Sequence, residues 1–223
     1  YEVTIVNGTV VVNPKALSVN DIIAEIQYGN TNGDFTFKAN EKGRLEGVVG
    51  EDKVSLVIDD TLGTEVVTGS AYDDAIGDGK HTANVRDDVY AGSIKVTGYE
   101  LTGDDASNYT LENSAVGGIR VTKADLTINI NGATTTYGTA LDMTTHGYTL
   151  DGVVNNDDEE ALKSDIDLAK GSYVTTAAYT GKAGTHNNVL GFEKAEDVKE
   201  LDVLNNYEVT IVNGTVVVNP KAL

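Results

Sequence analysis

The stretch YEVTIVNGTVVVNPKAL decides the fold, and it occurs twice in the chain, at residues 1–17 and at residues 207–223. Seventeen identical residues in the same order do not arise by chance in a chain of 223 residues. The sequence therefore indicates a tandem repeat with a period of 206 residues, of which this chain holds one full period and an overlap.

Two β-branched runs flank an Asn-Gly pair in this stretch, and Asn-Gly is the strongest short signal for a hairpin because both turn positions need a positive φ. We expect a hairpin at residues 1–12 and an identical hairpin at residues 207–218. Residues 1–12 are expected to be the closing hairpin of a preceding module and to pack on nothing within this chain except near the joint at residues 13–17. The alternating positions predict one buried face in each hairpin, formed in the first copy by Val3, Ile5, Val10 and Val12.

Weaker similarity inside the period divides it into two modules. Motifs recur in the same order at offsets of 109, 105 and 98 residues: Tyr28-Gly29 and Tyr137-Gly138, EGVVGEDKV (46–54) and DGVVNNDDE (151–159), and Asn108-Tyr109 and Asn206-Tyr207. We expect residues 1–13 to be the closing hairpin of the preceding repeat and residues 14–122 to form β-sandwich module A. Residues 123–223 are expected to form β-sandwich module B, which ends in the copy of residues 1–17.

Both modules have the pattern of mostly-β proteins. Residues 126–138 place Leu126, Ile128 and Ile130 on one face before a second Asn-Gly pair, and residues 94–103 alternate in the same way. Modules of about 100 residues with short alternating strands are typical of Ig-like β-sandwiches. Helices are expected only within residues 156–165 and 193–204.

The joints between modules have the composition of short, stiff connections. Neither the NPKAL joint nor the segment IRVTKADLTI (119–128) is rich in glycine and serine, as a flexible linker would be. The only prolines, Pro14 and Pro220, occupy the equivalent joint and fix φ there. We therefore expect two tandem Ig-like modules joined end to end.

The composition excludes several classes of function. The chain has 16 basic and 35 acidic residues and a net charge of −19, so a nucleic acid or an anionic membrane is not expected as a partner. No apolar run approaches the ~18–20 residues that span a bilayer. Cysteine is absent, which excludes disulfides, thiolate zinc sites and cysteine nucleophiles but is compatible with an extracellular location.

The order of these motifs resembles the MBG/YDG-type tandem repeats of very large bacterial surface adhesins, which include filamentous-haemagglutinin-like or stalk repeats. The resemblance covers essentially the whole period twice and is best at residues 94–128, whereas residues 187–209 depart from it. It implies an extracellular, repetitive stalk or adhesive fibre on a bacterial cell surface. The family name alludes to mucin binding, but no binding residue carries over to a position in this sequence.

The histidines, acidic clusters and lysines that could bind metal or form cross-links can also be ordinary surface residues. His81, His146 and His186 lack metal-ligand spacing and are interpreted as solvated loop residues. The acidic clusters are either calcium ligands or solvated loops, although none fits a known calcium-loop pattern; they comprise Asp59-Asp60, Asp73 to Asp78 and Asp157 to Glu160. A Lys–Asn isopeptide cross-link involving Lys15 or Lys123 is a further alternative.

The tyrosines at matching module positions, Tyr28, Tyr109, Tyr137 and Tyr207, are either an aromatic platform for sugar or fold residues with buried rings and bonded hydroxyls. Recurrence in both modules favours the second interpretation.

The sequence predicts a non-enzymatic structural repeat unit of an extracellular bacterial surface fibre or adhesin stalk. The alternative is a glycan- or mucin-binding adhesive module. No catalytic, cofactor-binding or metal-binding residue is predicted, and no cofactor is expected. The expected partners are neighbouring repeats of the same polypeptide or fibre, with host or matrix glycans or proteins as further partners.

Overall fold

The computed structural model describes residues 1–31, 33–112, 114–144 and 146–222, apart from the side chains of residues 59–61. Strands make up 45% and helices 12% of the chain, so the expectation of a mostly-β protein with several sheets is confirmed. The chain divides into two compact units that are not continuous in sequence. Unit 1 comprises Tyr1–Glu25, Phe35–Asp74 and Val89–Arg120, and unit 2 comprises Ile26–Asp34, Ala75–Asp88 and Val121–Leu223.

Unit 1 is built on a sheet with the strand order β2-β1-β6-β4-β3, and β5 pairs in parallel with β1. Its elements are β1 (Lys15–Gln27), β2 (Thr36–Glu46), β3 (Ser55–Val66), α1 (Ala71–Ala75), β4 (Tyr90–Thr102), η1 (Ala106–Asn108), β5 (Tyr109–Leu111) and β6 (Ser114–Thr122). Alternate residues of the central strands fill the core, among them Ile94, Val96 and Ile119, each 0% exposed. The β-branched side chains suit this pleated, one-sided surface.

Unit 2 contains a sheet with the order β12-β7-β9 and a sheet with the order β10-β11-β13-β8. Its elements are β7 (Ala124–Ile130), β8 (Ala133–Thr136), β9 (Tyr148–Asp151), α2 (Glu159–Ala169), β10 (Tyr173–Thr175), β11 (Gly184–Phe192), α3 (Ala195–Lys199), η2 (Asp202–Leu204), β12 (Tyr207–Val212) and β13 (Gly214–Asn219). The predicted face of Leu126, Ile128 and Ile130 is buried, at 0%, 0% and 5% exposure. Helices form in both regions where the sequence predicts them, but the expectation that they occur only there is wrong, because α1 forms as well.

The predicted hairpin at residues 207–218 is wrong. β12 pairs in parallel with β7, while β13 pairs in parallel with β8 and antiparallel with β11, so the two strands belong to different sheets. The second Asn-Gly pair likewise separates β7 from β8. The β7–β8 segment and the β12–β13 segment therefore pass side by side from one sheet to the other, each at an Asn-Gly pair.

Close backbone approach explains these glycines better than turn geometry does. Neither Gly132 nor Gly214 has a φ in the left-handed region that a tight hairpin turn needs. A Cβ added at Gly214 would lie 2.5 Å from the Asn131 carbonyl oxygen, and one added at Gly132 would lie 2.8 Å from the Thr215 carbonyl oxygen. Glycine is needed because these two neighbouring segments leave no room for a side chain between them.

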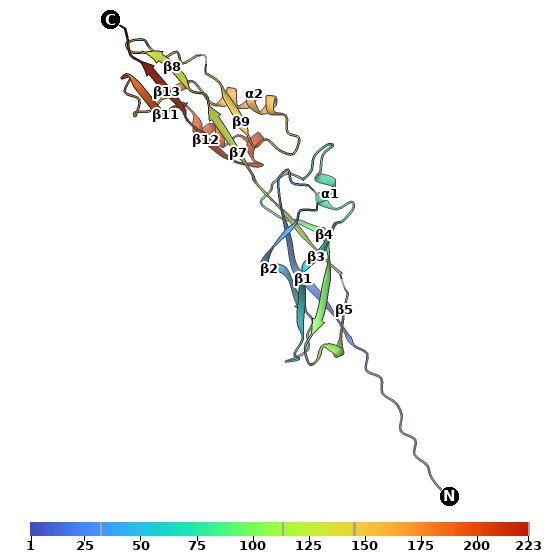
Figure 1. Cartoon of the computed structure of the whole chain (residues 1–223). Helices are drawn as coiled ribbons and strands as arrows, with labels where there is room; N and C mark the ends of the chain where they lie inside the picture. The colour runs from blue at the N-terminus through green and yellow to red at the C-terminus, as the bar shows by residue number, and fades with distance from the viewer. Residues whose placement is uncertain (32, 113, 145, 223) are drawn as a thin grey trace. The chain divides into compact units, whose positions relative to one another are not determined.

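Residues 1–12 have the same sequence as residues 207–218 and a different structure. They form no strand (Figure 1), and their apolar side chains are exposed, with Val3 at 82% and Ile5 at 84%. The predicted hairpin is therefore wrong here also, whereas the expected lack of packing within the described chain is confirmed. In the second copy β7, β8 and β11 pair with this sequence, so neighbouring strands decide its structure.

The parallel pairing of the late strand with the first strand recurs in both units. Tyr109 of β5 lies opposite Lys15 of β1, and Tyr207 of β12 lies opposite Ala124 of β7. These positions are related by the same offsets of 98 and 109 residues as the sequence motifs. The recurring motifs therefore occupy equivalent positions in the two units.

Candidate functional site around Asp157

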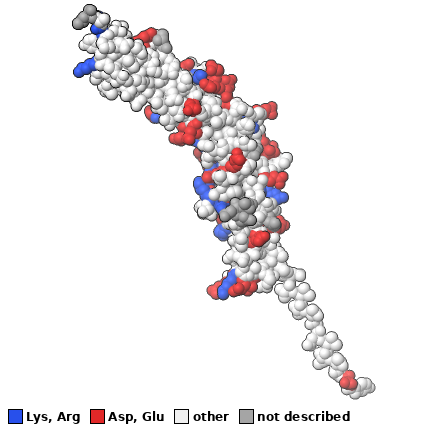
Figure 2. Space-filling view, in the orientation of Figure 1, with Lys and Arg blue, Asp and Glu red and all other residues white. Residues whose placement is uncertain are grey.

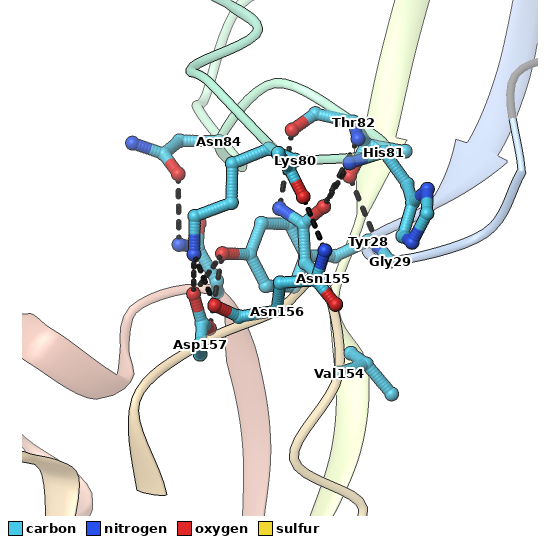
Figure 3. Close-up of polar contacts among 12 residues, drawn as sticks. Tyr28, Gly29, Lys80, His81, Thr82, Asn84, Val154, Asn155, Asn156 and Asp157 are labelled. Atoms are coloured by element: carbon cyan, nitrogen blue, oxygen red, sulfur yellow. Dashed lines mark hydrogen bonds and ion pairs between the residues drawn. The ribbon is translucent and has the colours of Figure 1, made fainter.

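Three segments of unit 2 that lie far apart in sequence meet at the Asp157 carboxylate (Figure 3). The Tyr207 hydroxyl donates to Asp157 Oδ2 at 2.6 Å, and the Tyr28 hydroxyl lies 3.0 Å from the same oxygen. The Lys80 ammonium lies 2.5 Å from Asp157 Oδ1. Tyr28, Lys80, Asp157 and Tyr207, together with Gly29, Thr82, Val154 and Asn155 described below, are called the Asp157 cluster.

The two tyrosines of the cluster are buried donors. Each is 2% exposed, and their rings pack edge to face with centroids 5.6 Å apart. Burial, together with the Asp157 carboxylate, raises the pKa of both hydroxyls above the ordinary value of 10.0. Both groups therefore stay protonated and able to donate to a carboxylate at neutral pH.

Asn155 fixes the segment that carries Lys80. Its side-chain oxygen accepts hydrogen bonds from the backbone N–H groups of His81 at 2.6 Å and Thr82 at 3.1 Å, and its side-chain nitrogen donates to the Thr82 carbonyl at 3.1 Å. Asn155 is 3% exposed and has a φ of 58°, a left-handed conformation that asparagine tolerates better than most residues. The buried side chain thus replaces backbone pairing for a segment without regular structure.

Gly29 lets the Tyr28 segment approach closely. Its N–H donates to Thr82 Oγ1 at 2.9 Å, its φ is 84°, and a Cβ added to it would lie 2.5 Å from Val154 Cγ2. Both residues of the Tyr-Gly pair are therefore needed. Tyrosine supplies the hydroxyl, and glycine alone allows both this backbone conformation and this close contact with Val154.

Unit 1 contains counterparts of Val154, Asp157 and Tyr207 of the cluster. The Tyr109 hydroxyl donates to Asp52 Oδ2 at 2.5 Å and accepts the Val49 N–H at 2.9 Å. In unit 2 the Val154 N–H lies 3.2 Å from the Tyr207 hydroxyl that donates to Asp157. The motifs GVVGED and GVVNND thus supply the same two partners to the tyrosine that follows asparagine in each unit.

This arrangement holds chain segments together. The Asp157 carboxylate forms an ion pair with the Lys80 ammonium and accepts hydrogen bonds from the hydroxyls of two buried tyrosines. Its side chain is only 17% exposed. Charge-assisted bonds of this kind are stronger than neutral ones and costly to break in a buried setting. Among the described residues no group of three or more His, Cys, Asp or Glu side chains is placed to hold a metal ion.

In the acidic run of residues 157–160, Asp158, Glu159 and Glu160 are exposed, as the solvated interpretation predicts, whereas Asp157 is half-buried. Asp157 is the acceptor of the cluster, and Asp158 caps α2 by accepting from the backbone N–H of Glu160 and Ala161. Glu159 forms an ion pair with Lys163 at 2.7 Å. Asp73 accepts the Gly69 N–H at 2.8 Å, while the side chains of Asp59 and Asp60 lie outside the described residues.

The other predicted groups lie in separate places. His81 is an exposed loop residue as expected, whereas His186 lies in β11 and its Nε2 is 2.8 Å from the Lys182 carbonyl. His146 is half-buried and packs edge to face on the Tyr173 ring. The Lys15 ammonium donates to the Gly47 carbonyl at 2.6 Å, so that lysine does not pair with an asparagine side chain.

The tyrosines divide into buried and exposed positions. Tyr28, Tyr109 and Tyr207 have buried rings and bonded hydroxyls, as the structural interpretation predicts. Tyr137 is 53% exposed, although it is the counterpart of Tyr28.

An open pocket of about 680 Å³ lies beside α2 in unit 2. Its lining includes His146, Tyr148, Lys170 and Tyr173. His146 Nε2 is buried there without a hydrogen-bond partner among the described residues. Aromatic rings and charged side chains therefore line this pocket together.

Sequence reasoning missed Lys80, Thr82 and Asn155. One signal for Lys80 exists, because Gly79-Lys80 recurs as Gly181-Lys182, with both glycines in left-handed backbone at φ 72° and 67°. Asn155 and Thr82 have no such signal, since their contact joins segments 73 residues apart in the chain.

Comparison with protein-family models, curated proteins and solved structures finds no match for this chain. In the described part of the chain no helix is long and apolar enough to cross a membrane.

Proposed function

We propose that this chain is a structural repeat unit of an extracellular bacterial surface fibre or adhesin stalk, of the MBG/YDG type that its motifs resemble, and that it is not an enzyme. The observation that carries the proposal is the Asp157 cluster, in which the motif residues that recur along the sequence bond to one another. Side chains that recur because they hold backbone segments together are those that a repeated structural unit needs.

The connectivity of the chain differs from that of two domains joined by one flexible linker. The described chain passes between the two units five times, after Glu25, Asp34, Asp74, Asp88 and Arg120. A single flexible linker would join two domains once and would leave them free to reorient. Five passages are more than a single linker provides, and this connectivity supports the proposal of a structural repeat unit.

The surface charge supports a role in which neighbouring fibres stay apart. Figure 2 shows acidic side chains spread over the visible face with fewer basic ones among them, in keeping with the net charge of −19. Such an excess keeps proteins soluble and apart through long-range repulsion. The partners proposed are neighbouring repeats of the same polypeptide, whereas nucleic acid and membrane insertion are not part of the proposal.

The description of the modules as Ig-like is also a proposal. An Ig-like sandwich packs two antiparallel sheets face to face. The antiparallel pairs β3–β4, β4–β6 and β11–β13 fit that description, whereas the parallel pairs β7–β12 and β8–β13 depart from it.

Immunogold electron microscopy of the source cells tests the proposed function. An antibody raised against the purified chain should label filaments that project from intact, unpermeabilised bacteria, at regular intervals along each filament. Label that requires permeabilised cells would contradict an extracellular fibre, and a strain lacking the gene is the control for specificity.

The alternative function is binding of glycans or mucin, and the pocket beside α2 favours it. Aromatic rings with adjacent charged groups are typical of sugar sites, and Lys170 lies 5.3 Å from the Tyr173 ring centre there. Titration of the chain with mucin-type oligosaccharides tests it: saturable binding that Lys170→Ala weakens would favour this function, and no binding at millimolar oligosaccharide would exclude it for these sugars.

A further inference from the structure

We propose that unit 2 docks on unit 1 of the next copy of the repeat, by inserting Tyr137, Gly138 and Lys182 against Val49, Asp52 and Tyr109. The inference rests on the proposed function in one respect, since it requires copies that follow one another in tandem. It names the partner of the exposed tyrosine and the residues of both surfaces.

The Asp157 cluster shows how such a contact is made, because its residues other than Thr82 and Asn155 form two halves. The receiving half is Val154, Asp157 and Tyr207, in which the tyrosine hydroxyl donates to the carboxylate. The inserted half is Tyr28-Gly29 with Lys80, which adds a second hydroxyl and an ammonium to the same carboxylate.

Unit 1 has a receiving half without an inserted half. Val49, Asp52 and Tyr109 make the same bonds to one another as Val154, Asp157 and Tyr207. Among the described residues Asp52 receives no second tyrosine hydroxyl and no lysine ammonium. Val49 is 52% exposed, whereas its counterpart Val154 is in contact range of Gly29. An exposed valine beside a carboxylate with spare acceptor capacity is the surface that the inserted half covers in unit 2.

Unit 2 has an inserted half without a receiving half. Tyr137 is 53% exposed and Tyr28 only 2%, yet their backbones are alike. The Tyr137 N–H donates to the Asn219 carbonyl at 2.8 Å, as the Tyr28 N–H does to the Thr122 carbonyl at 2.8 Å.

The glycines that follow the two tyrosines agree as closely. Gly138 has a φ of 83° and Gly29 a φ of 84°. A Cβ on Gly138 would meet nothing within 4 Å, while one on Gly29 would strike Val154. The Tyr137-Gly138 turn therefore already has the docked conformation, and the space beside it is open.

A matching lysine directly precedes a residue that lies near this turn. Lys182 is exposed and is the counterpart of Lys80, since both follow a glycine with a left-handed backbone. Its neighbour Ala183 lines a shallow, mainly apolar pocket together with Tyr137, Pro220 and Lys221. Tyr137 and the neighbour of Lys182 thus line one mainly apolar surface, which suits the exposed valine of the receiving half.

The occupant of this surface follows from the repeat. Residues 207–223 repeat residues 1–17, so the next residues of a tandem chain correspond to residue 18 onwards and form the next unit 1. In that unit the receiving half is the copy of Val49, Asp52 and Tyr109. Covalent linkage places the two surfaces at high effective concentration, so a modest contact area is enough for docking.

Amide hydrogen exchange in a two-period chain tests the inference. The chain is residues 1–223 followed once more by residues 18–223, with 15N in only one period so that NMR distinguishes the identical sequences. Residues 47–52 of the second period follow a unit 2 and should exchange about tenfold more slowly than those of the first period.

Tyr137→Ala placed in either period supplies the matched control. In the first period it should abolish the difference between the two copies of residues 47–52, whereas in the second period, where no unit 1 follows, it should change nothing. Equal exchange in the two unmodified copies would overturn the inference. This result is independent of the immunogold result, because it reads a contact in the purified chain rather than a location on cells.

Discussion

At the scale of single residues, Asp157 decides how unit 2 is held together. Its carboxylate is the shared acceptor for side chains from segments 50 and 129 residues away in sequence. Its oxygens would be poorly solvated if these donors were lost, and a buried acceptor without partners costs more than the bond itself contributes. Removal of single hydroxyl groups therefore tests the importance of the cluster without disturbing its shape.

We expect Tyr207→Phe to lower the free energy of unfolding by about 1–3 kcal/mol, because Asp157 loses its shortest hydroxyl donor and the Val154 N–H loses an acceptor. Urea denaturation followed by circular dichroism measures this change. Tyr137→Phe is the matched control, since its ring is exposed, and it should stay within about 0.5 kcal/mol. Equal effects of the two substitutions would contradict the role given to the cluster.

Alkaline pH provides a second test at this scale. Burial raises the pKa of Tyr99 from 10.0 to about 12. Between these values the unfolded chain releases a proton that the folded chain retains, so the unfolded state binds fewer protons and stability falls as the pH rises. The contribution is complete below about pH 10 and is lost toward about pH 12.

Urea midpoints of the wild type and Tyr99→Phe at pH 9, 10 and 11 measure this dependence. Phenylalanine does not titrate, so the variant should lose less stability between pH 9 and pH 11 than the wild type, whatever its stability at pH 9. Parallel pH curves for the two proteins would show that Tyr99 does not contribute to the alkaline loss.

At the scale of elements, identical sequences form different structures at the two ends of the chain. Residues 207–218 form β12 and β13, whereas residues 1–12 form no strand. The β propensity of this stretch is the same in both places, so the partners β7, β8 and β11 supply the difference. The sequence of a segment can show that it favours a β-strand. Whether the strand forms depends on partner strands elsewhere in the chain.

We expect Gly214→Ala to destabilise the chain by about 1–3 kcal/mol, because the added Cβ would lie 2.5 Å from the Asn131 carbonyl oxygen at the crossing of the two chains. Gly8→Ala is a control in an identical local sequence, where a Cβ meets nothing within 4 Å, and it should change stability by less than about 0.5 kcal/mol. Thermal unfolding of both variants measures the difference. If Gly214→Ala were neutral, close packing at the crossing would be disproved.

The sequence allowed a correct prediction of strand faces and of equivalent positions, but not of contacts. Alternation correctly predicted the buried face of Leu126, Ile128 and Ile130, because one-sided burial produces that pattern directly. The Asn-Gly pairs led to wrong hairpins, because glycine serves both tight turns and close backbone approach and the sequence does not distinguish them. Internal similarity shows which residues correspond, whereas the contact of Tyr28 with Asp157 joins residues that do not correspond.

At the scale of the whole molecule, the proposed docking would join consecutive repeats through the same kind of contact that the Asp157 cluster makes within unit 2. Sequence similarity places Tyr28 and Lys80 in the first module, and the structure includes them in unit 2. If each module contributes such residues to the module that follows, the same contacts join every pair of consecutive modules in a chain of many repeats. A fibre of this kind lengthens by a fixed increment with each period.

The contour length of recombinant chains with two, four and eight periods, measured by electron microscopy, tests the fibre proposal most directly. A β-sandwich with strands of about 10–12 residues is about 35–40 Å long, so each 206-residue period should add a constant ~70–90 Å. Slender rods with this increment are the predicted result. Particles that stay compact, or whose length varies at random for a given number of periods, would contradict the proposal that the chain is a stiff structural repeat.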